Sequence, residues 1–167
     1  MAVGAANGII IGQMLGANKL EESKDAAYKL IAVSFVISLV VALAYAISAE
    51  FIPLAYNTES EIRHLATRMM QLTAVARPFD AITHAAYFTL RSGGKTMITF
   101  IFDSGFIWAI SFTTAFFLTK YTGIQILPLY IIVQLADFIK VVVSVFLLKS
   151  GIWVNNLTGE NKKKEKI

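Results

Sequence analysis

Long runs without charged residues are the feature that most constrains this 167-residue chain. The range 30–49 holds 20 uncharged residues, 97–119 holds 23 residues with a single charge, and 126–148 contains two charges. About 20 helical residues are enough to cross the hydrocarbon core of a bilayer. Hydrophobic residues make up 56% of the chain and charged residues 16%, against roughly 45–50% and 25% in soluble domains. These runs predict an all-α membrane protein.

Two further segments complete the expected bundle. Residues 1–17 carry no charged side chain and have glycine at every fourth position from 4 to 16, a spacing that forms a smooth helix face for close packing. An alternative is that Asn7 and Gln13 face a substrate path. The range 69–90 is long enough to span despite its ionisable residues. We therefore expect a polytopic bundle (residues 1–154) of five transmembrane helices, followed by a basic tail (155–167); the helices are placed at about 1–17, 30–49, 69–90, 97–119 and 126–148.

Basic residues are distributed unequally between the two sides of the expected bundle. The connector 18–29, the loop 91–95 and the tail from Lys149 together contain ten Lys and Arg residues, and the opposite flanks contain three. The positive-inside rule predicts that the side with ten is cytoplasmic, including the C-terminus of a multi-pass plasma-membrane protein. Tyr56, Tyr121 and Trp153 are expected at the interfaces with water. No basic patch is interleaved with aromatic residues, so a nucleic-acid partner is not expected.

Ionisable residues in the third apolar run indicate a binding site, because charges at membrane depth are costly and by default functional. Asp80 and His84 are four residues apart and share one helix face; Thr73 and Tyr87 lie seven residues from Asp80 on either side, roughly on that face. We predict that Asp80, Thr73, His84 and Tyr87 bind a cation or a substrate. A sodium ion at Asp80 is one candidate.

Two neighbours of Asp80 affect this prediction. Pro78 has no N–H group, so it leaves the carbonyl of Ala74 without a helical partner and is expected to kink the helix. That free carbonyl would help to hold a small cation near Asp80. Arg77 lies three residues before Asp80, and an intrahelical pair between them is the alternative, purely structural interpretation.

The remaining charges within the apolar runs are assigned secondary roles. Asp137 and Lys140 are three residues apart, and we expect a buried structural pair, with a second cation site as the alternative. Asp103 is expected to cap or pair near the loop 91–95. Trp108 is expected to pack against neighbours or lipid, the alternative being a pocket for aromatic cations. The motifs HExxH and GxSxG and the P-loop are missing, so an enzyme is not expected.

The motifs around these residues resemble the multidrug and toxic compound extrusion (MATE) transporters. Asp80, followed by Leu90-Arg91 and Ser-Gly-Gly-Lys-Thr, is similar to the tenth transmembrane helix of that family and the loop after it. The segment GAANGIIIGQMLGANKLEESKDA looks like the eighth helix and its cytoplasmic loop. The pairs Asp103…Trp108 and Asp137…Lys140 and the ending SGIWVNNLTG also match. The order and spacing of these motifs extend the resemblance over nearly the whole chain.

The resemblance implies half of a two-lobe transporter, helices 8–12 of twelve. It implies a secondary active antiporter that exports organic, often cationic, drugs or toxins in exchange for Na⁺ or H⁺, with no other cofactor. Ala76 stands where some sodium-coupled members have tyrosine, so the coupling ion stays open. The implied partners are membrane lipid, small organic cations, and the missing N-terminal lobe and helix 7, so the chain is expected to be a fragment that does not transport alone. The alternatives are a lipid-linked oligosaccharide flippase of the same superfamily and a non-transporting membrane interaction module built on the glycine face.

Overall fold

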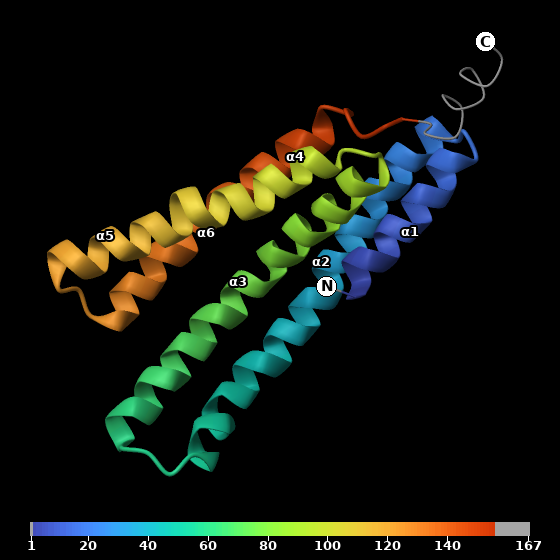
Figure 1. Ribbon diagram of the computed structural model, residues 1–167. Helices are drawn as coiled ribbons and strands as arrows, with labels where there is room; N and C mark the ends of the chain where they lie inside the picture. Colours follow the sequence, from blue (N-terminus) through green and yellow to red (C-terminus); the bar gives the residue numbers. More distant parts are fainter. Residues whose placement is uncertain (1, 156–167) are drawn as a thin grey trace.

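The computed structural model describes residues 2–155, and within that range the chain forms helices joined by short turns, without a strand (Figure 1). The all-α prediction is therefore confirmed. Met1 and residues 156–167, which include almost all of the expected basic tail, lie outside the described residues.

The described chain folds into five successive helical segments. The first two are α1 (Ala2–Gly16) and α2 (Leu20–Phe51), the latter extended by a short 3₁₀ turn, η1 (Ile52–Ala55). The third is α3 (Ser60–Ser92). The fourth, which we call the 96–122 helix, joins α4 (Thr96–Phe100), the π-helical segments η2 (Ile101–Gly105) and η3 (Ile107–Phe112), and α5 (Thr113–Thr122). The fifth is α6 (Ile126–Lys149).

Three of these segments are long and apolar enough to cross a membrane: residues 20–55, 96–122 and 126–149. At 33 residues α3 also has sufficient length, but it carries the ionisable residues discussed above. The 15 residues of α1 are fewer than a spanning helix needs. The structure thus has a helix at each of the five expected positions, and three of them meet both the length and the composition of a span.

The polar connector 18–29 is mostly part of α2 and not a separate helix. Exposed ion pairs run along its first turns: Lys19–Glu22 at 3.0 Å, Lys24–Glu21 at 2.8 Å and Lys29–Asp25 at 2.6 Å. Pairs three or four residues apart stabilise a helix in water by a few tenths of a kcal/mol each, roughly 0.2–0.5. Because these residues also have favourable helix propensity, the helix begins well before its apolar part.

The helices form two arms that meet at one end of the molecule (Figure 1). In one arm, α1 packs beside the first half of α2 and the last half of α3; the other arm consists of the 96–122 helix and α6. The turn between α3 and α4 and the end of α6 lie at the joined end. The arms diverge toward the opposite end, where the starts of α3 and α6 line a common groove of about 860 Å³.

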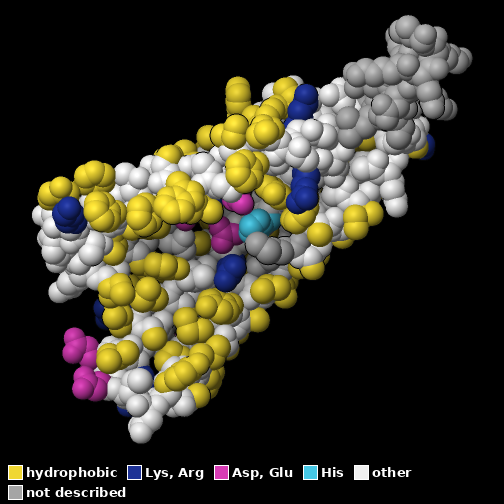
Figure 2. Space-filling model, in the orientation of Figure 1, with side chains coloured by type: hydrophobic (Ala, Val, Ile, Leu, Met, Phe, Trp, Pro, Cys, Tyr) yellow, Lys and Arg dark blue, Asp and Glu magenta, His cyan; other side chains and the backbone are white. Residues whose placement is uncertain are grey.

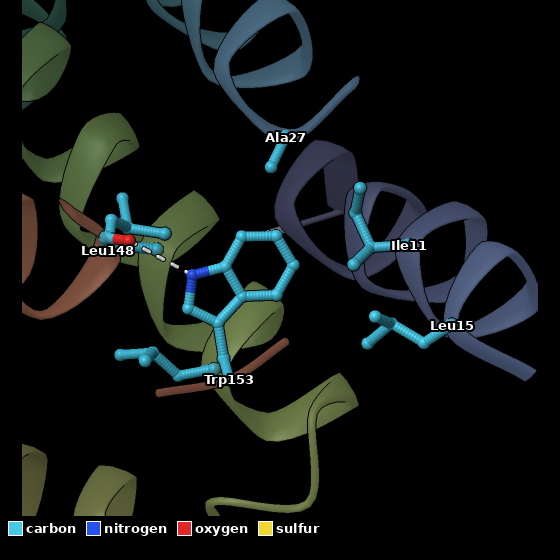
Figure 3. Close-up of a cluster of buried hydrophobic side chains, with 7 residues drawn as sticks. Ile11, Leu15, Ala27, Leu148 and Trp153 are labelled. Atoms are coloured by element: carbon cyan, nitrogen blue, oxygen red, sulfur yellow. Dashed lines mark hydrogen bonds between the residues drawn. The ribbon is translucent and has the colours of Figure 1, made fainter. Parts of the chain in front are cut away.

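A hydrophobic cluster closes the joined end around Trp153, which is 1% exposed. Figure 3 shows its indole between Leu148 on one side and Ile11, Leu15 and Ala27 on the other. The indole N–H donates a hydrogen bond to the carbonyl of Leu148 at 3.1 Å. The expectation that Trp153 belongs to an interfacial aromatic belt is therefore wrong. The chain turns back after α6 and inserts this side chain among the helices of the other arm.

The predicted glycine face is confirmed at its first two positions, where α1 packs against α3. A Cβ atom on Gly4 would lie 2.9 Å from the Phe88 ring, and one on Gly8 would lie 3.1 Å from the Cβ of Phe88. The hydroxyl of Ser92 donates a 2.6 Å hydrogen bond to the carbonyl of Gly8. At Gly16 a Cβ atom would meet no atom within 4 Å, so the close approach ends before the helix does.

The polar residues of α1 do not face a common path. Asn7 is buried, and its amide donates a 2.8 Å hydrogen bond to the hydroxyl of Ser34 in α2. Gln13 is exposed. Asn7 is therefore an interhelical hydrogen-bonding residue, since its amide is already used to hold α1 against α2.

Candidate cation and substrate site

A cavity of about 320 Å³ lies where α1, α2 and α3 meet. Its charged residues all come from α3, and its hydroxyl groups come from α2. Figure 2 shows acidic, histidine and basic side chains gathered in a hollow between the two arms. The residues that line the cavity are Val3, Gly4, Ser34, Ile37, Ser38, Val41, Tyr45, Arg77, Asp80, Ala81 and His84.

Asp80 and His84 line this cavity together. Their four-residue spacing on the continuous helix α3 puts both side chains on one face, as the sequence predicts. Within residues 2–155, the Asp80 carboxylate has no hydrogen bond and no ion pair, although it interacts electrostatically with His84. The arrangement is a carboxylate without a hydrogen-bonded partner among these residues, in a mostly apolar cavity between α1, α2 and α3.

Arg77 is turned away from a pair with Asp80. Its guanidinium carbon lies 5.8 Å from the centroid of the Tyr45 ring, within the range of a cation–π contact. Of the ion pairs found in residues 2–155, none joins Arg77 to Asp80. The intrahelical ion pair of the structural interpretation is therefore not formed, although Arg77 lines the same cavity and its charge still acts on Asp80.

Thr73 and Tyr87 lie outside the cavity. The hydroxyl of Thr73 shares a 2.6 Å hydrogen bond with the hydroxyl of Tyr130 in α6. The ring of Tyr87 packs edge-to-face on Phe88, with centroids 5.4 Å apart. A spacing of seven residues keeps a side chain only roughly on the same helix face. Thr73 therefore contacts α6, and Tyr87 contacts Phe88, instead of the cavity.

Pro78 lines a different depression of the surface. Together with Ala74 and Phe79 it contributes to an apolar groove of about 740 Å³ between α2 and α3. Ala74 does not line the cavity that contains Asp80, so the expected contribution of its carbonyl to a cation site there is not seen. The helix α3 continues through Pro78 from Ser60 to Ser92.

A second polar group connects the 96–122 helix with α6. The ammonium of Lys140 lies 3.6 Å from a carboxylate oxygen of Asp103 and 5.2 Å from the centroid of the Phe106 ring. Ser111 donates a 2.8 Å hydrogen bond to Asp137. The expected pair between Asp137 and Lys140 does not form, because each of these side chains has a partner across the helix interface. Asp103 does pair, but with Lys140 in the middle of α6 and not at the loop 91–95. Ser111 and Phe106 are residues that the sequence analysis did not identify.

The cavity residues Asp80 and His84 and the contacts around Lys140 lie at the same level of the bundle. The helices α3 and α6 run in the same direction, and Phe79 packs on Phe138 with ring centroids 5.0 Å apart. This contact places the adjacent residues Asp80 and Asp137 at the same height. We call the resulting set the ionisable layer; it consists of Arg77, Asp80, His84, Asp103, Asp137 and Lys140. In the part of the chain that the structure describes, no three His, Cys, Asp or Glu residues are grouped so as to hold a metal ion.

Comparisons with known proteins agree with the motifs. The multidrug resistance protein MdtK of Yersinia enterocolitica is 29% identical over 118 residues, which are 71% of this chain and 26% of MdtK. The probable multidrug resistance protein YoeA of Bacillus subtilis is 24% identical over 132 residues, 78% of this chain and 28% of YoeA. The chain thus spans about a quarter of the length of these curated relatives. No solved structure matches it.

A family comparison covers most of the chain. The model of the MatE family matches residues 1–113, which include α1, α2, α3, the Asp80 cavity and Asp103. The chain therefore belongs to the MatE family.

Proposed function

We propose that this chain forms the C-terminal lobe of a multidrug exporter in which Na⁺ or H⁺ binds at Asp80 and is exchanged for an organic, often cationic, compound. The observation that carries the proposal is the Asp80 carboxylate, which lines a mostly apolar cavity and has no ion-pair partner among residues 2–155. Family membership and the multidrug resistance names of two relatives support it.

The cavity has suitable chemistry for a cation. An unpaired carboxylate in an apolar surrounding is costly, and an entering cation or proton offsets that cost. Hydroxyl groups of Ser34 and Ser38 provide neutral oxygen atoms, whereas the Tyr45 ring is already in contact with Arg77. The proposal rests on Asp80 and His84 and does not include Thr73 and Tyr87, which lie outside the cavity.

Exchange requires that the two ligands affect one conformational equilibrium. A ligand shifts such an equilibrium only by its difference in affinity for the two states. If the coupling cation and the drug cation both require the negative charge of Asp80, they compete, and each stabilises the state in which it binds better. In transporters built from two repeats, this equilibrium is the rocking of one half against the other around the site.

The second half of such a transporter is not part of residues 1–167. We infer that transport needs the N-terminal lobe and helix 7, since five helices do not enclose a two-lobe cavity. Cells that express residues 1–167 alone should therefore retain ethidium as cells without the gene do, in a dye-efflux assay. Efflux by residues 1–167 alone would contradict this inference. The ten-to-three charge bias supports a plasma-membrane protein with a cytoplasmic C-terminus.

The central test is Asp80→Asn in the full-length transporter, measured as ethidium efflux and drug resistance in cells. We expect loss of both at unchanged protein level, because the amide has nearly the same shape but no charge. The matched control is Asp25→Asn, the same chemical change in an exposed pair with Lys29 on the first turns of α2, which should keep wild-type efflux.

Two outcomes would favour other functions. A lipid-linked oligosaccharide flippase predicts that neither the wild type nor Asp80→Asn changes drug sensitivity. A membrane interaction module predicts that Asp80→Asn has no effect on efflux or assembly; Gly8→Leu does not identify such a module, because Gly8 packs against Phe88 within the same chain. Efflux by Asp80→Asn equal to that of the wild type would rule out the proposed mechanism.

A further inference from the structure

The ionisable layer carries an unbalanced charge. It contains three acidic residues, Asp80, Asp103 and Asp137, and two basic residues, Arg77 and Lys140. With the imidazole of His84 neutral, the sum is one negative charge. An unbalanced charge is unfavourable at membrane depth, and one monovalent cation removes it. This count rests on the proposed function, in which that cation binds at Asp80.

Lys140 is placed where it can set this balance. Its side chain is 15% exposed, against 52% for its partner Asp103. The separation of 3.6 Å between their charged atoms is longer than a hydrogen bond, so the ammonium is held by charge and by the Phe106 ring rather than by fixed donor–acceptor geometry. Asp137 lies one turn away on the same helix. Among residues 2–155 the ammonium forms an ion pair with Asp103 and none with Asp137, which accepts a hydrogen bond from Ser111.

The same ammonium acts on the cavity. The charge of Lys140 acts on Asp80 and His84 more weakly than the carboxylates beside it, since Asp137 acts more strongly on Asp80 and Asp103 more strongly on His84. The contact between Phe79 and Phe138 keeps α3 and α6 in the register that places these groups at one level. Charges are weakly screened where water is scarce, so their influence extends beyond direct contact.

We propose that Lys140 is a built-in counter-cation that sets the number of external cations bound by the ionisable layer. By neutralising Asp103, with which it pairs, Lys140 leaves a net single negative charge in the layer for the site at Asp80. It is a positioning residue, since it acts through the charge balance and does not line the cavity. Removing Lys140 should strengthen cation binding, and removing Asp103 should weaken it.

The test uses the purified full-length transporter with ethidium as the cationic probe, its dissociation constant measured by fluorescence anisotropy. Lys140→Met keeps the length and the apolar stem of the side chain but raises the negative charge of the layer to two, and should tighten ethidium binding about tenfold. Asp103→Asn makes the layer neutral and should weaken binding about tenfold. Asp103→Asn should weaken ethidium binding even though Asp103 does not line the Asp80 cavity.

The double variant Asp103→Asn/Lys140→Met separates charge balance from structural support. It restores the single negative charge of the wild type, so its dissociation constant should return to within about threefold of the wild-type value. If the pair served only to hold the 96–122 helix on α6, both single variants and the double variant would lose thermal stability, and affinity would not be rescued. Absence of rescue would overturn the proposal.

Failure of this inference can be distinguished from failure of the proposed function. If Asp80→Asn binds ethidium as the wild type does, the proposed site is wrong. If Asp80→Asn loses binding while Lys140→Met and Asp103→Asn bind as the wild type does, only the role of Lys140 is wrong. A gain of affinity in Lys140→Met cannot result from misfolding, so this variant decides the question even if Asp103→Asn fails to fold.

Discussion

Gly93 lies so close to Trp153 that a Cβ atom on Gly93 would overlap the carbonyl carbon and oxygen of Trp153. Both sides of this contact are backbone, so neither can rotate away. Gly93 follows the last residue of α3, and Trp153 lies in the segment after α6. The contact therefore fixes the end of one arm against the end of the other.

The first prediction concerns this contact. Gly93→Ala should force the two backbone segments apart and destabilise the protein by about 1–3 kcal/mol, the usual cost of overpacking, or more. The measurement is the thermal midpoint of the protein in detergent. Gly16→Ala is the control, because a Cβ atom there meets no atom within 4 Å. Equal midpoints for the two variants would contradict the close approach.

The second prediction compares the two tryptophans. Trp153→Ala should cost about 3–5 kcal/mol, because it leaves a cavity among the buried side chains of the cluster and removes the hydrogen bond to Leu148. Trp108→Ala should have little effect on folding, since Trp108 is 68% exposed. Thermal midpoints of both variants check the difference. A larger loss for Trp108→Ala would contradict the placement of both residues.

The third prediction concerns the glycine face of α1. In Gly8→Ala the new Cβ atom would lie 3.1 Å from Phe88 and 3.2 Å from the hydroxyl of Ser92, so the variant should lose stability. In Gly12→Ala the nearest atom is 3.8 Å away. There alanine should be neutral or stabilising, because glycine inside a helix costs about 0.5–1 kcal/mol relative to alanine. The opposite signs are the diagnostic result, measured by thermal unfolding in detergent.

The fourth prediction concerns the hydrogen bond between Thr73 and Tyr130. A double-mutant cycle with Thr73→Val and Tyr130→Phe should give a coupling energy of about 0.6 kcal/mol and at most about 1.7, the range found for such bonds between membrane helices. Ethidium affinity should stay at the wild-type value in Thr73→Val, because Thr73 does not line the cavity. A loss of ethidium affinity in Thr73→Val as large as that in Asp80→Asn would show that Thr73 belongs to the binding site.

The helices themselves could be predicted because each is determined by a local property. Runs such as 30–49 and 126–148 are apolar over the thickness of a bilayer, and no other secondary structure within a single segment satisfies all backbone groups there. The boundaries were less accurate where charged residues continue a helix into water. This is why α2 begins at Leu20, ten residues before its apolar part.

The sequence predicts only the part of the site that lies on a single helix. Asp80 and His84 face the same cavity because their spacing on α3 is fixed. The partners of Thr73 and Lys140 lie on other helices, and sequence spacing contains no information on which helices touch. The π-helical turns in the 96–122 helix also change the direction of the side chains after them, which a period of 3.6 residues does not describe.

The cluster that joins the two arms determines which end of α6 would move if this helix tilted. Because the cluster around Trp153 closes one end of the molecule and the arms diverge toward the other, any tilt of α6 about that cluster would displace the far end of the helix most. Its 24 residues measure about 36 Å, so a tilt of about 5° moves the far end by about 3 Å and the near end hardly at all. The hydrogen bond of Tyr130, in the second turn of α6, would register such a tilt long before the packing at the cluster changed.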